Sequence, residues 1–258
     1  MEAMQLPNGL TVSQVNVDET EFLYHEIFTE RCYLRNEITL APGDTVLDVG
    51  ANIGLTTLFL HTEFPGLTFY CFEPAPVPYA ALSDNIAAHK INATAVRCAL
   101  SDHSGVGDLT YYPHCTAMSG FHPDLAEEAA LGRSVLLNSG FANEVVDAIE
   151  ATRNEAETLR TVQCSVRTLS EVITEQRITS VDLLKVDVQK SELEVLGGLA
   201  EADWPKIRQC IAEVHDVNGG LRSFTSLLAE HGFSVTVQQD ALFDGTEIYM
   251  VFAWRNAA

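Results

Sequence analysis

The sequence is poor in positive charge and has no long apolar run. Lysine and arginine together number 15, against 36 aspartates and glutamates, and the formal net charge is −21. A field of that sign repels phosphate backbones and anionic lipid surfaces, which argues against nucleic acid and membranes as partners. No segment approaches the roughly 20 apolar residues of a membrane helix, and the acidic, polar start is unlike a secretory signal. We therefore expect a soluble, cytoplasmic protein.

Cysteine motifs for zinc or redox chemistry are absent, as are internal repeats and low-complexity segments. No C-x-x-C pair occurs among the six cysteines, which are Cys32, Cys71, Cys98, Cys115, Cys164 and Cys210. Several of them lie within apolar runs that are typical of strands. This pattern favours small buried hydrophobic side chains, with a disulfide framework or a zinc site as the alternative.

Apolar residues are numerous enough for one substantial core. The chain has 258 residues, of which 47% are hydrophobic, and this length is usual for a single α/β domain. We therefore predict one domain over residues 1–258, with an N-terminal cap segment at about 1–40 and a lid insertion at about 114–160. The insertion includes a polar helical stretch at 143–159, for which a solvated decoration is the alternative to a lid.

From Thr45 onward, short β-branched runs alternate with helical stretches. This alternation predicts an α/β, Rossmann-like fold: a mostly parallel sheet with crossover helices on both faces. The predicted strands are 45–49, 68–72, 95–100, 181–186 and 209–214, and the predicted helices are 53–61, 79–89, 191–199 and 221–231. Two final runs, 233–237 and 248–254, are joined by a segment too short for a crossover helix, so they should form a C-terminal antiparallel hairpin.

The most specific motif joins the first predicted strand to the first predicted helix. It reads Asp48-Val49-Gly50-Ala51-Asn52-Ile53-Gly54. Open α/β sheets bind nucleotide-like ligands at this turn. Gly50 and Gly54 let a ligand lie against the main chain, the helix N-terminus can receive a carboxylate, and Asp48 offers a carboxylate to an ammonium group. These needs match the amino-acid end of S-adenosylmethionine.

A nicotinamide cofactor fits the same turn less well. A dinucleotide site would have glycine where this chain has Asn52, whose side chain stands where a pyrophosphate must approach closely. A nicotinamide-dependent oxidoreductase is therefore a weaker alternative.

The next two strands also end in polar residues. Glu73, followed by Pro74, lies at the spacing from the glycine turn where an acidic residue meets ribose hydroxyls. Ser101 and Asp102 follow the third strand, where either could accept a hydrogen bond from an adenine amino group. Each alone could equally be a turn residue. Because all three strand ends carry such groups in order, the sequence predicts a methyltransferase that binds S-adenosylmethionine.

These motifs resemble the signatures of the FkbM-type methyltransferase family. The matching segments are Asp48 to Gly54, Phe72-Glu73-Pro74, Ala99-Leu100-Ser101-Asp102, Lys185-Val186-Asp187-Val188 with Glu192-Leu193-Glu194-Val195-Leu196, and Glu213-Val214-His215. The resemblance covers roughly residues 18–254. It implies a class I methyltransferase whose sheet has seven strands, the last of them antiparallel. It also implies methylation of a hydroxyl oxygen, commonly on natural products or sugars.

Two further segments resemble family members that accompany polyketide and nonribosomal peptide assembly lines. They are residues 20–28, and 111–113 followed by 118–121. This resemblance leaves open whether the acceptor is a free small molecule or a thioester on a carrier protein, and whether the chain is part of a larger assembly-line protein. One departure is that many members have Glu-Gly after the Asp187-Val188 pair, whereas this chain has Gln189-Lys190, so position 189 receives no role.

Methyl transfer to a hydroxyl requires that its proton be removed, a task that suits histidine, whose reference pKa is roughly 6.5. His215 ends a predicted core strand at the edge where ligands bind, and Glu213 lies on the same face two residues earlier. We predict that His215 is the general base, that Glu213 orients either His215 or the acceptor, and that Asp187 holds the acceptor hydroxyl or the cofactor ammonium. The alternatives are a histidine that only ends a strand and an aspartate that caps a turn.

Metal dependence has little support in the sequence. Asp187, Glu213, His215 and Asp216 could supply ligands but show no diagnostic spacing, so we expect a metal-free mechanism. Methylation of nitrogen or of a carboxylate, and a non-catalytic module that binds S-adenosylmethionine, remain as alternatives. The sequence determines neither the acceptor nor the oligomeric state.

Overall fold

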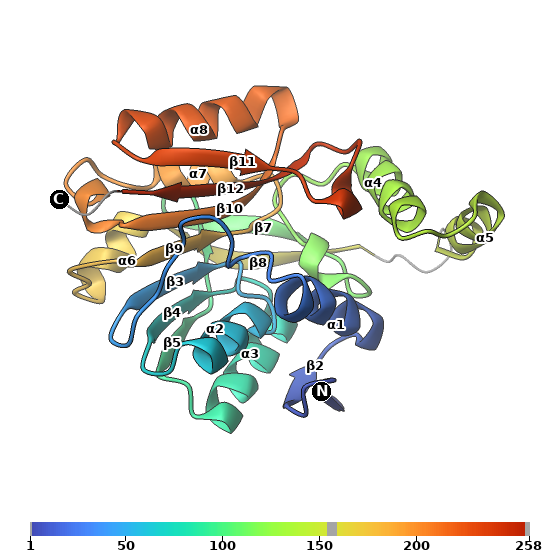
Figure 1. Cartoon of the computed structure of the whole chain (residues 1–258), viewed down its shortest axis with the longest axis horizontal. Coiled ribbons are helices and arrows are strands. Elements are labelled where there is room, and N and C mark those ends of the chain that lie inside the picture. Colours follow the sequence, from blue (N-terminus) through green and yellow to red (C-terminus); the bar gives the residue numbers. More distant parts are fainter. Residues whose placement is uncertain (1, 154–158, 256–258) are drawn as a thin grey trace.

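A seven-stranded sheet forms the centre of the structure, a computed structural model that describes residues 2–153 and 159–255 (Figure 1). Its strands, in spatial order, are β11 (Ser234–Gln238), β12 (Ile248–Trp254), β10 (Gln209–His215), β9 (Leu183–Val186), β3 (Thr45–Val49), β4 (Thr68–Phe72) and β5 (Ala93–Val96). All residues of β9 and β10 are buried. Helices cover both faces of this sheet, so its central strands have near-continuous apolar sequences.

The C-terminal hairpin is confirmed. β12 pairs antiparallel with both β10 and β11, whereas the β3–β4, β4–β5, β3–β9 and β9–β10 pairs are parallel. In the register of β10 and β12, His215 lies opposite Ile248. The carboxyl ends of the parallel strands therefore meet at one edge of the sheet.

Helices cover both faces of the sheet, as predicted. On one face, α2 (Leu55–Glu63) and α3 (Pro76–His89) pack around Phe59 and Leu82. On the other, α6 (Leu169–Glu175), α7 (Glu192–Gly197) and α8 (Gly220–Glu230) pack around Leu169 and Phe224. In Figure 1, α2 and α3 lie beside β4 and β5 in the lower half of the view, and α8 lies next to β11 at the top. Gly232 has φ +84° after α8, consistent with the predicted helix end.

The predicted strand 95–100 is wrong as a single element. β5 ends at Val96, and Ala99–Leu100 form β6 in a second sheet with β8 (Arg160–Arg167) and β7 (Gly105–Tyr111), in the order β6-β8-β7. The Cys98 amide donates to the Val96 carbonyl over 3.0 Å, a tight turn that redirects the chain. Both halves are largely apolar, so the sequence gives no sign of the bend.

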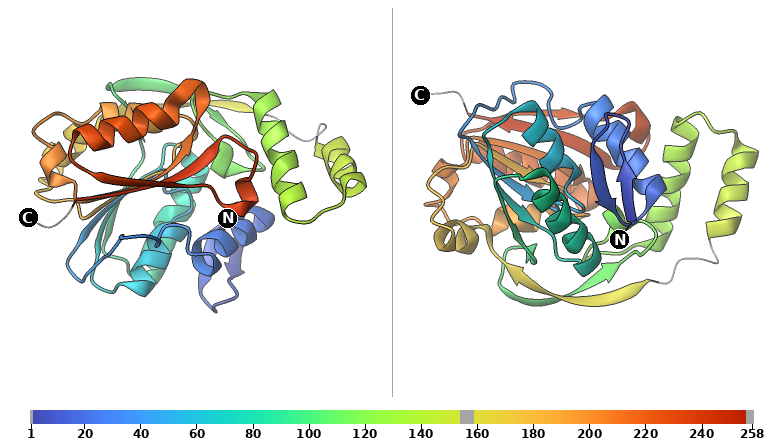
Figure 2. Two further views of the ribbon diagram at one scale, coloured as in Figure 1. Left: turned by 45° about the horizontal axis from the view of Figure 1, so that its top comes forward. Right: turned by 90° about the horizontal axis from the view of Figure 1, so that it is seen from below.

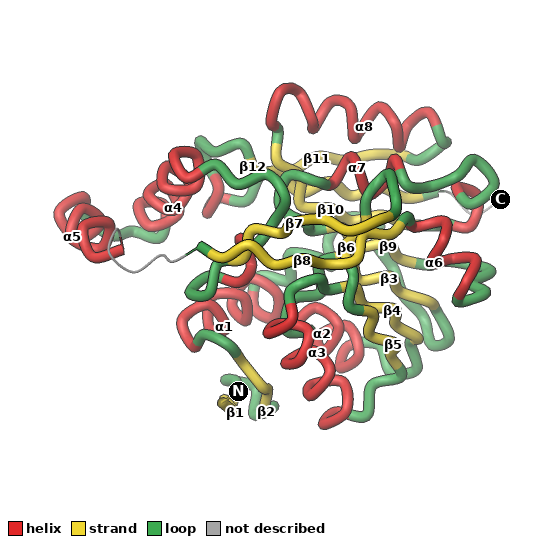
Figure 3. Tube along the Cα trace, turned by 180° about the vertical axis from the view of Figure 1, so that it is seen from behind, coloured by secondary structure: helices red, strands yellow, loops and turns green. Residues whose placement is uncertain are grey.

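The insertion is carried by this second sheet, between β7 and β8 (Figure 3). It contains a short turn η2 (Thr116–Met118) and the helices α4 (Leu125–Asn138) and α5 (Asn143–Arg153). Of the predicted helical stretch 143–159, residues 143–153 are helical and 154–158 lie outside the described residues. Figure 2 shows α4 and α5 projecting beyond the edge of the central sheet. None of the α4 residues is buried.

The N-terminal segment consists of a two-stranded sheet and a helix. β1 (Glu2–Gln5) and β2 (Thr11–Gln14) pair antiparallel, and α1 (Val17–Tyr24), which Asn16 caps, continues into the π-helical turn η1 (His25–Thr29). Phe28 of η1 packs edge to face on Phe59 of α2, with ring centroids 5.1 Å apart. The remaining short turns are η3 (Trp204–Lys206), η4 (Val217–Gly219) and η5 (Ala241–Phe243).

Most of the cysteines are buried, as predicted. Cys32, Cys71, Cys98, Cys164 and Cys210 are buried, and Cys115 is partly exposed. Among the helices in residues 2–153 and 159–255, none is both long and apolar enough to cross a lipid bilayer.

Candidate active site

A cavity lies at the carboxyl edge of the central sheet. It has an empty volume of about 850 Å³ and is partly open to solvent. The strand ends β3, β4 and β9 contribute Gly50, Glu73 and Asp187 to its lining, and the insertion contributes Thr116 to Ala117 and Ser119 to Phe121. The cavity therefore occupies the place where the sequence predicted the cofactor.

The turn between β3 and α2 is shaped by left-handed residues. Gly50, Asn52 and Gly54 have φ angles of +78°, +48° and +88°. A Cβ at Gly50 would lie 1.8 Å from the Asp187 carbonyl oxygen, and one at Gly54 would lie 2.7 Å from Leu82 Cδ1. Both glycines are thus required by neighbouring protein atoms, in addition to any ligand that approaches the turn.

Asn52 connects this turn to the rest of the cavity wall. Its main-chain amide donates to Glu73 Oε2 over 2.9 Å, and its side-chain amide donates to Thr116 Oγ1 over 3.1 Å. The Thr116 amide and hydroxyl both donate to the Glu19 carboxylate of α1, each over 3.0 Å. The N-terminal segment and the insertion therefore meet directly beside the turn.

Glu73 ends β4 and lines the cavity with Pro74. Its carboxylate accepts the amides of Asn52 and Ala75, over 2.9 and 2.8 Å. Burial raises the pKa of Glu73 to about 7, and the two amide hydrogen bonds only partly offset that effect. This carboxyl group therefore titrates close to neutral pH.

Asp48 does not line the cavity, although the sequence suggested that it binds a ligand ammonium group. Its side chain is buried, accepts the Thr57 hydroxyl over 2.7 Å, and lies 3.2 Å from Lys185 Nζ. Strand β3 points this side chain into the core beside α2. The main role of Asp48 in the structure is thus to hold Lys185.

Lys185 is a fully buried cation that sequence reasoning gave no role. Its ammonium group donates to the Gly50 carbonyl over 2.7 Å and lies 3.4 Å from Asp187 Oδ2. Burial alone would lower the pKa of Lys185, but the carboxylates of Asp48 and Asp187 outweigh it and raise that pKa above its usual value. A lysine inside the otherwise apolar strand β9 was the available signal.

Asp187 is the carboxylate that reaches the cavity. Its side chain is about one quarter exposed (24%), and Oδ2 accepts the Tyr33 hydroxyl over 2.9 Å. Tyr33, which follows η1, also lines the cavity and was not predicted from the sequence. The Asp187 side chain is therefore partly accessible from the cavity, while the buried ammonium group of Lys185 contacts its Oδ2.

Ser101 and Asp102 lie outside the cavity. The Ser101 hydroxyl donates to Glu194 over 3.2 Å, and the largely exposed Asp102 side chain contacts the His103 imidazole over 2.7 Å. The wall that leads toward them is instead formed by Cys98, Ala99 and Leu100. The structure therefore does not bring the predicted adenine ligands to the cavity.

His215 ends β10 with a buried imidazole ring. Nδ1 lies 3.2 Å from Glu192 Oε1, and both side chains are only 3% exposed. Nε2 is buried and has no hydrogen-bond partner in the part of the chain that the structure describes. A carboxylate that accepts from Nδ1–H leaves Nε2 as the basic nitrogen.

Glu213 is not the partner of His215. Its side chain is buried and does not line the cavity. Burial raises the pKa of Glu213 well above its usual range, and the nearby Asp187 adds to this. The carboxylate in contact with the imidazole is instead that of Glu192 in α7.

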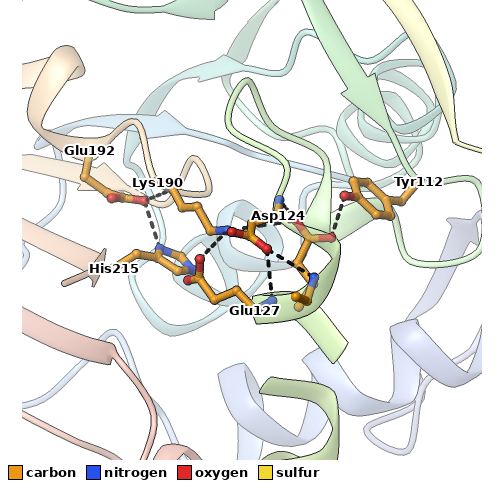
Figure 4. Close-up of polar contacts among 8 residues, drawn as sticks. Tyr112, Asp124, Glu127, Lys190, Glu192 and His215 are labelled. Atoms are coloured by element: carbon orange, nitrogen blue, oxygen red, sulfur yellow. Dashed lines mark hydrogen bonds and ion pairs between the residues drawn. The ribbon is translucent and has the colours of Figure 1, made fainter. Parts of the chain in front are cut away.

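A second cavity, of about 640 Å³, adjoins the first and is lined by His215. Gln189 lines both cavities. Met118 of η2 lines the second cavity, whereas the two preceding residues of η2 line the first. Leu131 of α4 also lines the second cavity. Figure 4 shows His215 and Glu192 beside Lys190, which reaches toward Glu127. Among residues 2–153 and 159–255, no group of three or more His, Cys, Asp or Glu side chains is arranged to hold a metal ion.

Comparisons with known proteins agree with this geometry. The family model described as "Methyltransferase FkbM domain" matches residues 48–235. The chain is 52% identical to the 31-O-demethyl-FK506 methyltransferase FkbM of Streptomyces tacrolimicus, over 100% of this chain and 98% of that protein. It is 36% identical to part of the AMB antimetabolite synthetase AmbE of Pseudomonas aeruginosa, over 98% of this chain but 12% of that protein.

A solved structure supports the fold. The crystal structure of the methyltransferase FkbM from Methylobacillus flagellatus superposes with a TM-score of 0.54 at 13% identity. The superposition covers 85% of this chain and 46% of that chain. At this identity the likeness shows the shared fold alone.

Proposed function

This chain belongs to the FkbM family of S-adenosylmethionine-dependent methyltransferases, and from that premise we propose that it methylates a hydroxyl of an uncharged small molecule with His215 as the general base. The observation that carries the proposal is the unpartnered, buried Nε2 of His215 beside a cavity that adjoins the cofactor cavity. The relative from Streptomyces tacrolimicus, whose name describes O-methylation of a natural product, supports the same class of reaction.

The residues that line the first cavity support the binding of S-adenosylmethionine there. The exposed part of the Asp187 carboxylate would bind the ammonium group, and the N-terminus of α2, where Leu55 and Thr56 line the cavity, would receive the carboxylate. Glu73 would accept the ribose hydroxyls, and the apolar wall at Leu100 would cover the base. When bound, this cofactor supplies the methyl group on a sulfonium, so that no metal is needed to activate the carbon.

The His215–Glu192 pair is suited to removing a proton. The Glu192 carboxylate accepts Nδ1–H, which fixes the ring tautomer and leaves Nε2 free to take the hydroxyl proton. The same carboxylate then stabilises the imidazolium cation that forms. Because the pair is buried, few water molecules compete with the acceptor for Nε2.

The charge of the second cavity favours a neutral acceptor. Glu127, Glu128 and Glu247 line it against one cation, Lys190, so a carboxylate ligand would be repelled. Leu131 and Ile248, which also line this cavity, offer apolar surface to the body of the acceptor. This balance argues against carboxyl methylation, whereas an amine acceptor would not be repelled.

The names of two relatives bear on the setting of the reaction. One is named as a methyltransferase of 31-O-demethyl-FK506, and the other is named as a synthetase, of which this chain matches 12%. We propose a hydroxylated natural-product intermediate, either free or bound to a carrier protein, as the acceptor, and the cytoplasm as the location. We also propose that residues 1–258 act as one domain, with the N-terminal segment as a cap and the insertion as a lid.

A matched panel of acceptors tests the proposed function. Apolar alcohols, and their amine and carboxylate counterparts, are incubated with S-adenosylmethionine, and mass spectrometry follows the gain of one methyl group and the release of S-adenosylhomocysteine. We expect turnover with alcohols, retained in EDTA. Methylation of amines or carboxylates alone would support the alternative reactions, binding without any turnover would support a non-catalytic module, and activity lost in EDTA but restored by Mg²⁺ would contradict the metal-free mechanism.

The affinity for S-adenosylhomocysteine is expected to rise with pH up to about 7 because of Glu73. Below its pKa of about 7 this carboxyl is protonated and loses acceptor capacity, so ribose binding favours the ionised form that predominates above that pH. The expected slope is at most about tenfold per pH unit. Calorimetry across this range measures it, with Glu73→Gln as the control that should lose this contribution. Identical pH profiles for both proteins would remove Glu73 from the ribose site.

A further inference from the structure

The loop between β9 and α7 contains two consecutive residues in the left-handed backbone region. Gln189 and Lys190 have φ angles of +55° and +72°. Side chains with a Cβ are sterically disfavoured there, and such conformations persist only where other contacts hold them. The contacts of Lys190 therefore indicate what holds this loop in place.

The side chain of Lys190 connects the loop to α4. It is only 9% exposed, and Nζ lies 3.0 Å from Glu127 Oε2 and 3.9 Å from Glu128 Oε1. Glu128 also accepts the Tyr112 hydroxyl and the main-chain amide of Asp124, the residue that caps α4 (Figure 4). The ion pair thus joins the loop to the first turn of the helix.

The main chain of Lys190 connects the loop to the catalytic pair. Its amide donates to Glu192 Oε1 over 2.8 Å, and His215 Nδ1 lies 3.2 Å from that same oxygen. One carboxylate oxygen therefore serves both the Lys190 amide and the imidazole. A change in the left-handed conformation of Lys190 would move the amide away from Glu192.

Helix α4 has no fully buried residue, although Leu131, Val135, Leu136 and Leu137 are partly buried. Ala130, Leu131 and Ser134 line the second cavity. At its other end the Asn138 side chain donates to the carbonyls of Leu242 and Asp244, over 2.8 and 3.0 Å. A helix without a fully buried side chain loses less packing on opening than a core helix does.

We propose that Lys190 is a positioning residue that couples closure of α4 over the second cavity to the alignment of His215; this rests on the proposed function of that cavity. With α4 closed, the ion pair holds the left-handed main chain of Lys190, its amide fixes Glu192, and Glu192 fixes the Nδ1–H tautomer of His215. When α4 opens, the loop relaxes and the amide leaves Glu192. The base is then aligned only while the cavity is covered.

Two substitutions of Lys190 separate the effect of losing its ion pair from the effect of its left-handed backbone. Lys190→Gly removes the ion pair but adopts a positive φ without steric cost, whereas Lys190→Met removes the charge and keeps the steric cost. Both variants are expected to raise amide hydrogen exchange in residues 125–138 about tenfold, the effect of losing one charged hydrogen bond. Glu127→Gln, which weakens the ion pair from the α4 side, should behave as Lys190→Met does. Matched controls are Lys90→Gly and Lys90→Met, at an exposed lysine with φ +54° after α3.

The ring nitrogens of His215 give the second measurement. Their ¹⁵N shifts are expected to report the Nδ1–H tautomer in the wild type and in Lys190→Gly, and a mixture of tautomers in Lys190→Met. An unchanged tautomer in Lys190→Met, or a mixture in Lys190→Gly, would overturn the coupling, as would wild-type exchange of α4 in both variants. These measurements use the free protein and need no turnover, so their failure is distinct from failure of the proposed O-methylation.

Discussion

His215→Ala is expected to lower the rate of methyl transfer roughly 10²- to 10⁴-fold, the usual effect of removing a positioned general base. The affinity for S-adenosylhomocysteine should stay almost unchanged, because His215 lines the second cavity and not the one that fits the cofactor. Single-turnover rates with the best alcohol of the acceptor panel, together with calorimetry, measure the two quantities separately.

Two further variants test whether the lower rate of His215→Ala reflects the loss of a general base. His103→Ala removes a largely exposed imidazole that lines neither the first nor the second cavity, so it should keep the wild-type rate. Glu192→Gln retains a side-chain oxygen near Nδ1 but loses the charge that stabilises the imidazolium, so its rate should lie between those of the wild type and His215→Ala. A near-normal rate in His215→Ala would place the base elsewhere, or show that the acceptor needs none.

Lys185→Met is expected to lower the free energy of unfolding by about 3–5 kcal/mol. Removing the cation leaves the buried Asp48 carboxylate unpaired and takes the ammonium hydrogen bond from the Gly50 carbonyl. Urea denaturation should show a lower midpoint at an unchanged slope, because the surface exposed on unfolding stays the same.

The matched control is Lys206→Met. Lys206 also pairs with an aspartate, Asp203, over 2.7 Å, but its side chain is 32% exposed, and such pairs contribute roughly 0–1 kcal/mol. The double variant Lys185→Met with Asp48→Leu should regain part of the loss, since no unpaired charge remains in the core. Equal stability of Lys185→Met and Lys206→Met would show that the buried cation does not hold the cofactor turn.

Local sequence patterns determined most of the fold. The ranges 45–49, 68–72 and 248–254 were predicted without error as strands, since strands buried on both faces need uninterrupted apolar runs. The glycine turn was located for the same kind of reason, because positive φ angles and close approach restrict the residues that fit. The order of the strand ends then led to the first cavity, which has Gly50, Asn52, Glu73 and Asp187 on its wall.

Contacts between distant segments decided the orientation and the partners of the polar side chains. Sequence position could not tell that Asp48 turns into the core while Asp187 faces the cavity, because that choice depends on the buried Lys185 between them. His215 and Glu213 share a strand face, yet the partner of the imidazole is Glu192. This residue belongs to α7, and its Oε1 lies 3.2 Å from His215 Nδ1. Similarly, residues 95–100 were predicted as one strand despite Arg97 in their middle, and the pairing of Ala99–Leu100 with β8 separates them into two strands. Periodicity and propensity act over a few residues, whereas these outcomes depend on electrostatic and packing contacts between segments that only the complete tertiary structure brings together.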